Sequence, residues 1–366
     1  MPLKSFNITS KIKNYKVYFL SSREIKEKLL SIENPFYVID SNVWKFYSKK
    51  DFSFIKKHDS VLLLKISENM KSFSSVFSIY EKLFEMASKK NTNIIAIGGG
   101  ILQDVTGFAA STIYRGINWY FVPTTSLAQI DSCIGGKTSL NYKNYKNLIG
   151  TFYPPSEILI NPYFLKTLKE EYYYSGIGEM VKLFIIDGYK KAKEIASEME
   201  YIIDGNKQNL LISRIYDSLI IKKKYIEGDE LDKGIRNILN YGHCFGHALE
   251  GAVDFKIPHG LAVVIGMMVA NRISLKRNLI REKDFAFMNK EIFIHLTKKI
   301  RISGIRIRND DIINFMRKDK KRVGKALTMV LMKNGYKFQL FNDITDQEVL
   351  LSSDYFLKLN LKEYFI

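Results

Sequence analysis

The sequence is poor in cysteine, and this scarcity argues against a small disulfide-stabilised scaffold. Its two cysteines, Cys133 and Cys244, give no disulfide framework. Long apolar runs are also missing, because the longest near-continuous one, Leu261 to Ala270, is half the length of a membrane span. The N-terminal stretch lacks the apolar core and cleavage site of a signal peptide. We therefore expect a cytoplasmic protein without a membrane partner.

Acidic residues are the minority among the charges. The chain has 56 basic and 38 acidic residues, a formal net charge of +18. Such a balance can indicate nucleic-acid binding, but the lysines are scattered rather than gathered in one stripe or arm. Helix-turn-helix, zinc-finger and RNA-recognition signatures are absent. We therefore predict no nucleic-acid partner, a lysine-biased solvated surface, and a smaller share of the charge that serves an anionic substrate.

The apolar pattern changes between the two halves of the chain. Short apolar runs alternate with helical patterns in the first half, which predicts a parallel sheet with crossover helices. From about Lys166 the pattern becomes longer and helical. Near the C-terminus, "LTMVLMKNGYKFQLF" predicts a small hairpin that turns at Asn334-Gly335. A chain of 366 residues favours two domains, which we place at 1–170 and 171–366.

Two glycine-containing segments can hold a ligand in the first half. Gly98, Gly99 and Gly100 end an apolar strand just before a helix, where they serve either a phosphate or simply a tight turn. Asp104 in that helix either stabilises the helix terminus or bonds a ligand amide. The second segment is either an ordinary surface loop or the surround of an anionic small molecule. Its polar residues are Thr124, Thr125, Asp131, Lys137, Lys146 and Asn147.

Histidine is scarce, yet three of the five histidines fall within 17 residues. His243 and His247 lie four apart, on one face of a predicted helix, and His259 follows Pro258. A lone histidine is usually a core or cap residue, but three together with a carboxylate form a plausible divalent-metal site. Glu179 offers that carboxylate on an apolar helix face, which Lys182 shares.

The order and spacing of these motifs resemble the 3-dehydroquinate synthase family and, more broadly, the sugar-phosphate cyclases. The resemblance covers roughly Asp40 to Lys321. It is carried by "GGGILQDVTGFAASTIYRG", "PTTSLAQIDSCIGGKTS", "KNLIG", "SGIGEMVK", "GDELDKGIRNILNYGHCFGHALE" and "PHG".

This resemblance implies a Rossmann-like α/β N-terminal domain that binds NAD and a mainly α-helical C-terminal domain that binds metal and substrate. It places the active site in the cleft between them and implies zinc, with cobalt as an alternative ion, and a homodimer. The implied metal ligands are Glu179, His243 and His259. The implied NAD-binding residues are Asp40, Asn42, Glu68, Lys71, Gly99, Gly100, Asp104, Thr124 and Thr125.

The resemblance also assigns the substrate pocket. The implied catalytic residues are Lys137, Lys182, Lys222, Arg236, Asn240 and His247. The implied substrate-binding residues are Arg115, Asp131, Lys146, Asn147 and one of Lys320 and Lys321. With these positions matched, the resemblance predicts that His243 and His259 hold the metal while His247 faces the substrate.

The family reaction is a phosphate-eliminating lyase step in the shikimate pathway of aromatic amino acid biosynthesis. A secondary alcohol of 3-deoxy-D-arabino-heptulosonate 7-phosphate is oxidised by NAD, phosphate is eliminated, the ketone is reduced again, and an intramolecular aldol step gives 3-dehydroquinate. The metal acts as a Lewis acid, and the protein orients groups and offers positive charge. NAD is regenerated in each turnover.

Four positions depart from the family pattern. Leu261 replaces the acidic residue usual after "HG". Gln103 and Tyr145 each replace a glycine, and Asp232 replaces a longer glutamate. Loss of a partner behind a metal ligand can cost about 10–100-fold in metal affinity or activity. Alternatives are therefore a cyclase for another sugar phosphate, a metal-dependent polyol dehydrogenase that releases NADH, and a catalytically dead relative. Lys222, Arg236, Asn240 and His247 favour the dehydroquinate reaction.

Overall fold

The computed structural model describes residues 5–55, 60–143, 145–300, 308–317 and 326–360. The chain divides into two compact units, Met1–Leu168 and Lys169–Ile366, and each is described by itself. Lys320 and Lys321, one of which was predicted to reach the substrate, lie outside the described residues.

Unit 1 is built on a seven-stranded sheet with the order β1-β2-β9-β6-β5-β3-β4. The pairs β2–β9, β9–β6, β6–β5, β5–β3 and β3–β4 are parallel, and β1 joins β2 in antiparallel fashion. The strands of this sheet are β1 (Ser5–Ile8), β2 (Tyr15–Phe19), β3 (Pro35–Asp40), β4 (Val61–Leu64), β5 (Asn93–Gly98), β6 (Trp119–Pro123) and β9 (Glu157–Ile160). A separate hairpin is formed by β7 (Lys137–Tyr142) and β8 (Tyr145–Phe152).

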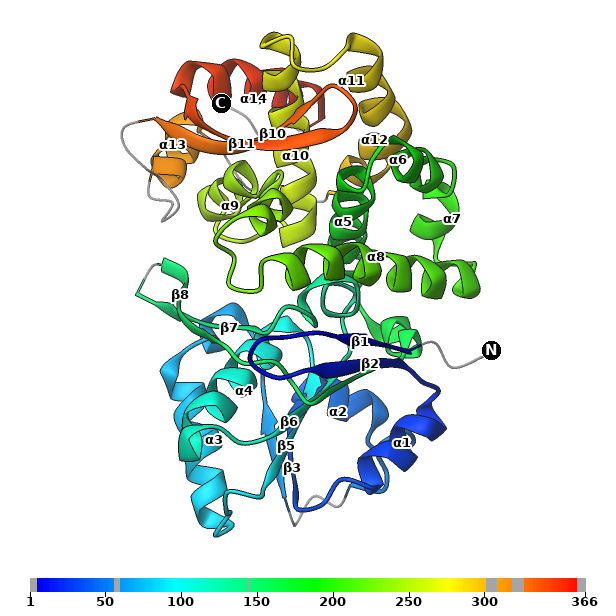
Figure 1. Cartoon of the computed structure of the whole chain (residues 1–366), viewed down its shortest axis with the longest axis vertical. Helices are drawn as coiled ribbons and strands as arrows, with labels where there is room; N and C mark the ends of the chain where they lie inside the picture. Colours follow the sequence, from blue (N-terminus) through cyan, green and yellow to red (C-terminus); the bar gives the residue numbers. More distant parts are fainter. Residues whose placement is uncertain (1–4, 56–59, 144, 301–307, 318–325, 361–366) are drawn as a thin grey trace. The chain divides into compact units, whose positions relative to one another are not determined.

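Helices cover both faces of this sheet (Figure 1). They are α1 (Ser22–Leu30), α2 (Ser41–Tyr47), α3 (Phe73–Glu85) and α4 (Gly100–Thr112), with the shorter turns η1 (Glu68–Met70), η2 (Ile113–Arg115), η3 (Ala128–Ser132) and η4 (Pro162–Thr167). Because successive side chains alternate across a strand, Ile95 and Ile97 join the core under α1 and α2, whereas Ile94 and Ala96 face the opposite side of the sheet. The strands β3, β5, β6 and β9 are buried on both faces, as expected of a parallel sheet.

Unit 2 is mainly helical and is organised around α10 (His259–Lys276), which is buried along most of its length. It packs against α5 (Glu170–Ile186), α9 (His243–Ala252) and α14 (Asp346–Asn360). The other helices are α6 (Tyr189–Ala196), α7 (Met199–Asp204), α8 (Gln208–Gly228), α11 (Glu282–Met288), α12 (Ile294–Thr297) and α13 (Asn309–Arg317), with η5 (Ile235–Asn240) and η6 (Asn289–Phe293). A hairpin of β10 (Leu327–Lys333) and β11 (Lys337–Ile344) completes the unit.

The predicted fold class, an α/β part followed by a mainly helical part, is confirmed. The predicted hairpin is present, but its loop spans residues 334–336 rather than the two residues Asn334-Gly335. Gly335 and Tyr336 both have positive φ in that loop. Within the described part of the chain, none of the helices has the length and apolar character needed to cross a membrane.

Candidate active site

In unit 1 the glycine turn lies where β5 ends and α4 begins. Gly99 is the N-cap of α4 and makes no side-chain capping bond. A Cβ at Gly99 would lie 2.8 Å from Thr125 Cγ2, and one at Gly98 would lie 2.6 Å from Leu102 Cδ2. Side chains are therefore excluded at this turn, and the first N–H groups of α4 remain available to an anion. Thr124 lies beside this turn at the same edge of the sheet, because its backbone N–H donates to Gly98 O at 2.9 Å.

The neighbouring strand brings Asp40 to the same edge of the sheet. Its Cβ lies 3.4 Å from the position that a Cβ on Gly98 would occupy. The Asp40 carboxylate accepts the backbone N–H of Asn42 at 2.8 Å and so caps α2. Burial raises the pKa of Asp40, and this hydrogen bond partly offsets the effect. The structure thus joins Asp40 and Asn42 to the glycine turn.

A charged network centres on Lys71, which is 7 % exposed. Its ammonium lies 2.6 Å from Asp104 Oδ2 and also hydrogen-bonds Asn147 Oδ1. Burial raises the pKa of Asp104, although the adjacent Lys71 ammonium acts in the opposite direction. Ser139 Oγ donates to the same Asn147 oxygen at 3.0 Å. Lys71 therefore connects α4 with the β7–β8 hairpin.

Glu68 lies beside this network. Its Oε1 accepts from Asn141 Nδ2 at 2.8 Å and lies 3.7 Å from Lys146 Nζ. The backbone N–H of Asn147 in turn donates to Asn141 Oδ1 at 2.9 Å. Residues predicted for NAD and residues predicted for substrate are thus joined in one set of contacts, which the sequence alone did not indicate.

Three further predicted residues of unit 1 lie in different settings. Asp131 sits in η3 and Lys137 opens β7, where it is exposed. Arg115 ends η2, after the 13-residue helix α4 has run about 20 Å away from the glycine turn. Arg115 therefore lies at the far end of α4 from the glycine turn, and its substrate role stays a prediction.

In unit 2, Glu179 and Lys182 occupy one face of α5, as their spacing predicts. The Glu179 side chain is fully buried, and its Oε2 forms an ion pair with Lys182 Nζ. Among the described residues, Glu179 Oε1 accepts no hydrogen bond. A buried carboxylate oxygen without a donor is costly, so this atom is suited to a cation.

Three histidines surround that oxygen. Glu179 Oε1 lies 3.7 Å from His243 Nε2 and 3.5 Å from His259 Nε2. One ring nitrogen from each of His243, His247 and His259 also lies within 4.8 Å of the others. Zinc ligands about 2.0–2.1 Å from the ion in a tetrahedron would be about 3.3–3.4 Å apart. The two separations from Glu179 Oε1 are close to this spacing, and His247 is the exposed member of the cluster.

The protonation of the cluster follows from its surroundings. Burial, followed by the Lys182 ammonium, lowers the pKa of His243 well below its usual range. Burial also acts to lower the pKa of His259, but the carboxylates of Glu250 and Glu179 outweigh it and raise the net value. A neutral imidazole can donate its lone pair to a metal, which is the state that burial favours at His243.

Close backbone contacts hold the helices that carry the cluster. A Cβ on Gly260 would lie 1.7 Å from Ser175 O, and one on Gly178 would lie 2.3 Å from Gly260 O. A Cβ on Gly266 would lie 1.9 Å from Gly242 O. Glycine at these positions lets α10 approach both α5 and the start of α9, which fixes where the metal-ligand candidates meet.

Other predicted residues of unit 2 come from α8 and η5. Lys222 and Arg236 are buried, and Asn240 ends η5. Arg236 Nη1 donates to Glu230 O at 2.6 Å, so the backbone before η5 orients the guanidinium. The Asp229 carboxylate accepts three backbone N–H groups of the same loop, including that of Arg236. Burial acts to raise the pKa of Asp229, but these bonds outweigh it and lower the net value.

Glu250 is a residue beside the histidine cluster that the sequence did not single out. Its Oε2 lies 3.0 Å from His259 Nδ1, and its side chain is buried. The available signal was its spacing, because residues 243, 247 and 250 follow one face of a helix. Two of the departures from the family pattern have ordinary surroundings: Leu261 is a buried apolar residue, and Gln103 bonds Ser132 twice, at 2.7 and 2.9 Å.

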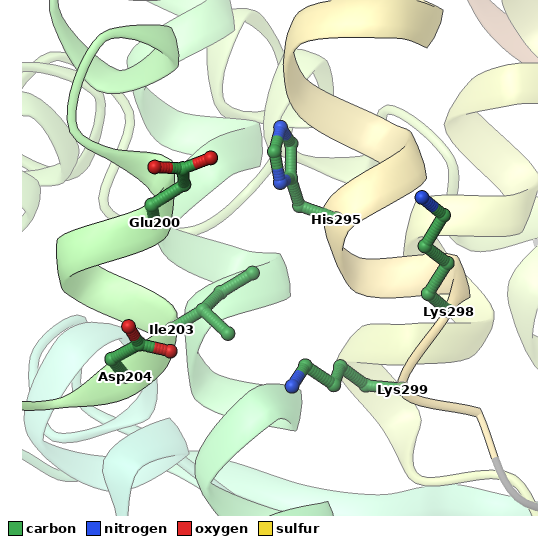
Figure 2. Close-up of a pocket in the computed structure, with 6 residues that line it drawn as sticks. All are labelled: Glu200, Ile203, Asp204, His295, Lys298 and Lys299. Atoms are coloured by element: carbon green, nitrogen blue, oxygen red, sulfur yellow. The ribbon is translucent and has the colours of Figure 1, made fainter.

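A separate hollow of about 490 Å³ lies in unit 2 and shares no residue with the histidine cluster (Figure 2). Acidic side chains of α7 line one wall and basic side chains from α12 and the residues after it line the other. The lining residues are Glu200, Ile203, Asp204, His295, Lys298 and Lys299. His295 is therefore a histidine of this unit that lies outside the candidate metal site.

Known proteins match this chain over most of its length. Family models described as 3-dehydroquinate synthase N-terminal and C-terminal match residues 61–175 and 176–322. A 3-dehydroquinate synthase of Pelagibacter ubique is 38% identical over 330 residues, covering 88% of this chain and 89% of that protein. One of Dictyoglomus turgidum is 33% identical over 356 residues, covering 95% and 97%.

Solved structures share the fold. The 2-epi-5-epi-valiolone synthase of Streptomyces hygroscopicus, solved with NAD+ and Zn2+ bound, has a TM-score of 0.83 at 21% identity and covers 96% of this chain and 99% of its own. A 2-deoxy-scyllo-inosose synthase complexed with carbaglucose-6-phosphate, NAD+ and Co2+ has a TM-score of 0.79 at 23% identity, covering 96% and 100%. The matches across both halves of the sequence decide the assignment: the chain belongs to the 3-dehydroquinate synthase family.

Proposed function

We propose that this chain is a 3-dehydroquinate synthase, which converts 3-deoxy-D-arabino-heptulosonate 7-phosphate to 3-dehydroquinate and phosphate. The observation that carries the proposal is the buried Glu179 oxygen, which faces Nε2 of His243 and of His259. It occurs in a chain whose relatives of that name match over most of its length.

Glu179, His243 and His259 would hold one Zn2+, with Co2+ as an alternative ion. The donor set of one carboxylate and two imidazoles is one that catalytic zinc sites use. When bound, the ion acts as a Lewis acid toward the oxygen of the reacting carbon. His247 lies in contact with both imidazoles but is the exposed member, so we assign it to the substrate.

NAD would bind at the carboxyl edge of the sheet in unit 1. The glycines there exclude side chains, and the N-terminus of α4 favours the negative charge of a pyrophosphate. We assign Asp40, Asn42, Thr124 and Thr125 to this cofactor because they meet the same edge. When bound, NAD would supply reversible hydride transfer, so net reductant would not be consumed.

The cationic side chains of the site would bind the two anionic ends of the substrate. Lys222 and Arg236 are buried, and Arg236 is oriented by Glu230 O, so its planar fork is held in place before a carboxylate arrives. Lys182 already neutralises Glu179 and adds positive charge beside the candidate metal ligands. Such fixed charges stabilise the carboxylate and the departing phosphate without reorganising.

The direct test supplies purified enzyme with the heptulosonate phosphate, NAD and Zn2+, and measures phosphate and the carbocyclic product together. We expect equal amounts of both and no accumulation of NADH. NADH produced in proportion to product would instead identify a polyol dehydrogenase. Cyclisation of only a carboxylate-free sugar phosphate would identify another cyclase, and absence of turnover with bound NAD and metal would identify a catalytically dead relative.

Assembly and location form a separate proposal. The family resemblance favours a homodimer in the cytoplasm. Sedimentation velocity at micromolar concentration tests the first part, and a monomer that is fully active would contradict it. Fractionation of the producing cell, with activity measured in each fraction, tests the second part.

A further inference from the structure

We propose that Glu250 is a positioning residue for the metal ligand His259. Its carboxylate holds the N–H at Nδ1 of His259, which leaves the lone pair of Nε2 directed toward Glu179. This inference rests on the proposed function, because it assumes that His259 is a metal ligand.

The geometry of α9 brings Glu250 to this place. Glu250 follows His243 by seven residues, two turns of the helix, so both project from the same face. One end of that face carries His243, which approaches Glu179, and the other end carries Glu250, which reaches His259 at 3.0 Å. A single helix thus supplies one ligand candidate and orients another on α10.

The chemistry of the pair determines the direction of the bond. An ionised carboxylate only accepts hydrogen bonds, so Nδ1 of His259 must be the donor. In a neutral imidazole the proton on Nδ1 leaves Nε2 as the nitrogen with the lone pair. Nε2 is the atom that lies 3.5 Å from Glu179 Oε1. The contact therefore selects the tautomer that can bind a metal beside Glu179.

The two histidines are held in the same way by different acceptors. His243 Nδ1 lies 3.3 Å from the carbonyl oxygen of Tyr241, a neutral group. His259 Nδ1 faces a carboxylate that is only 4 % exposed, which makes the interaction charge-assisted. We therefore expect His259 to be a more basic ligand than His243. We also expect the Glu250 contact to contribute more to metal affinity than the Tyr241 carbonyl contact.

Glu250 also bears on the departure at Leu261. Sequence comparison with the family raised the concern that a leucine two residues after His259 removes an acidic partner. Leu261 is buried at 1 % exposure, while a carboxylate reaches His259 from the preceding helix. The leucine therefore does not deprive His259 of a carboxylate partner.

The first experiment uses the unaltered protein. Long-range 1H–15N NMR of the metal-free chain, at a pH where the imidazoles are neutral, reports which ring nitrogen carries the proton. We expect His259 to be protonated on Nδ1, and His259→Gln identifies its signals. Protonation on Nε2 would overturn the proposal, and this measurement does not depend on a variant at position 250 folding.

The second experiment measures metal affinity. Competition with a chromogenic chelator should show Zn2+ affinity falling about 10-fold in Glu250→Gln, which keeps an acceptor but loses the charge, and about 100-fold in Glu250→Ala. The visible spectrum of Co2+-loaded protein should change with the ligand geometry in both. Asp284→Asn is the matched control, because it removes a buried carboxylate of the same unit that pairs with Arg281.

The outcomes separate this inference from the proposed function. Folded Glu250→Ala with wild-type Zn2+ affinity and Co2+ spectrum would overturn the role of Glu250 alone, since the wild type still binds metal. Wild-type protein that binds no Zn2+, or His243→Ala that binds it fully, would overturn the metal assignment itself. If Zn2+ affinity falls as much in Asp284→Asn as in Glu250→Ala, the loss of affinity comes from general destabilisation of the unit. That result would also overturn the positioning role.

Discussion

The two candidate ligand sites of this chain are formed by different kinds of chemical group. In unit 1 the edge at Gly98–Gly100 is made of backbone and small side chains, and its main property is space for a ligand. In unit 2 the cluster is made of ionisable side chains from three helices, gathered around the buried carboxylate of Glu179. Sites of the first kind tolerate changes in polar side chains but not added volume. Sites of the second kind fail when one donor is removed.

The largest expected effect tests the second kind of site. His243→Ala should remove bound zinc and lower kcat by at least about 1,000-fold, since a Lewis acid contributes several kcal/mol to such a reaction. His295→Ala is the control, because this histidine lines the separate hollow of Figure 2. Metal analysis and phosphate release measure both. Full metal content together with full activity in His243→Ala would contradict the assignment.

The next effect tests Arg236, a buried cation that we propose binds substrate rather than metal. Arg236→Lys keeps the charge but loses the planar fork, so kcat/KM should fall about 10–100-fold while zinc content stays unchanged. Arg281→Lys, at an exposed arginine paired with Asp284, is the matched control. Equal kcat/KM in Arg236→Lys and wild type would show that bidentate binding is not needed at this position.

A smaller effect tests the first kind of site. Gly99→Ala adds a Cβ that would lie 2.8 Å from Thr125 Cγ2, and overpacking of this size costs about 1–3 kcal/mol. We expect NAD affinity, measured by calorimetry, to fall about 10-fold while Zn2+ affinity is unchanged. Gly228→Ala, whose added Cβ would be 3.9 Å from Ile235, is the control. Unchanged NAD affinity in Gly99→Ala would show that the glycine turn is not part of the cofactor site.

The smallest effect lies away from both sites. Arg277 bonds Glu348 through two nitrogens, at 2.6 and 2.9 Å, and lowers the pKa of Glu348 to about 2. Because the folded-state pKa is below the usual value of 4.5, this stability is present above pH 4.5 and is lost as the pH falls toward 2.

Glu348→Gln should therefore unfold at lower urea than wild type at pH 7, by about 1 kcal/mol after allowance for solvent screening. The difference should shrink as the pH is lowered below 4.5. Activity at pH 7 should match wild type under folding conditions. If the stability difference between wild type and Glu348→Gln instead grows as the pH is lowered, the contribution of the Arg277–Glu348 pair is not the one expected.

The positions of both candidate sites along the chain could be predicted from the sequence, for physical reasons. The edge at Gly98–Gly100 could be placed because an apolar strand, three glycines and a helical pattern follow one another. The histidine cluster could be placed because a spacing of four residues survives in any helix. Both features are local in sequence, so the predicted strand–glycine–helix turn and the predicted histidine helix agree with the observed elements, whereas the ligand roles of these residues stay predictions.

Contacts between distant segments could not be predicted in the same way. The pairing of Lys71 with Asp104 and Asn147 joins residues far apart in the chain, and no periodicity reveals it. The contact of Glu250 with His259 crosses from one helix to the next. The strand β9 is only four residues long, and its place between β2 and β6 depends on sheet order rather than on its own pattern.

The glycine contacts of α10 have a consequence for ion selectivity. Because Gly260 and Gly266 place α10 directly against the backbone at Ser175 and Gly242, the helices have little freedom to move together or apart. Ca2+ takes six to eight oxygen ligands and Mg2+ requires octahedral oxygen coordination, whereas this rigid set offers two imidazoles and one carboxylate. If Glu179, His243 and His259 bind an ion as proposed, this fixed donor set would favour transition metals over the abundant ions of the cell.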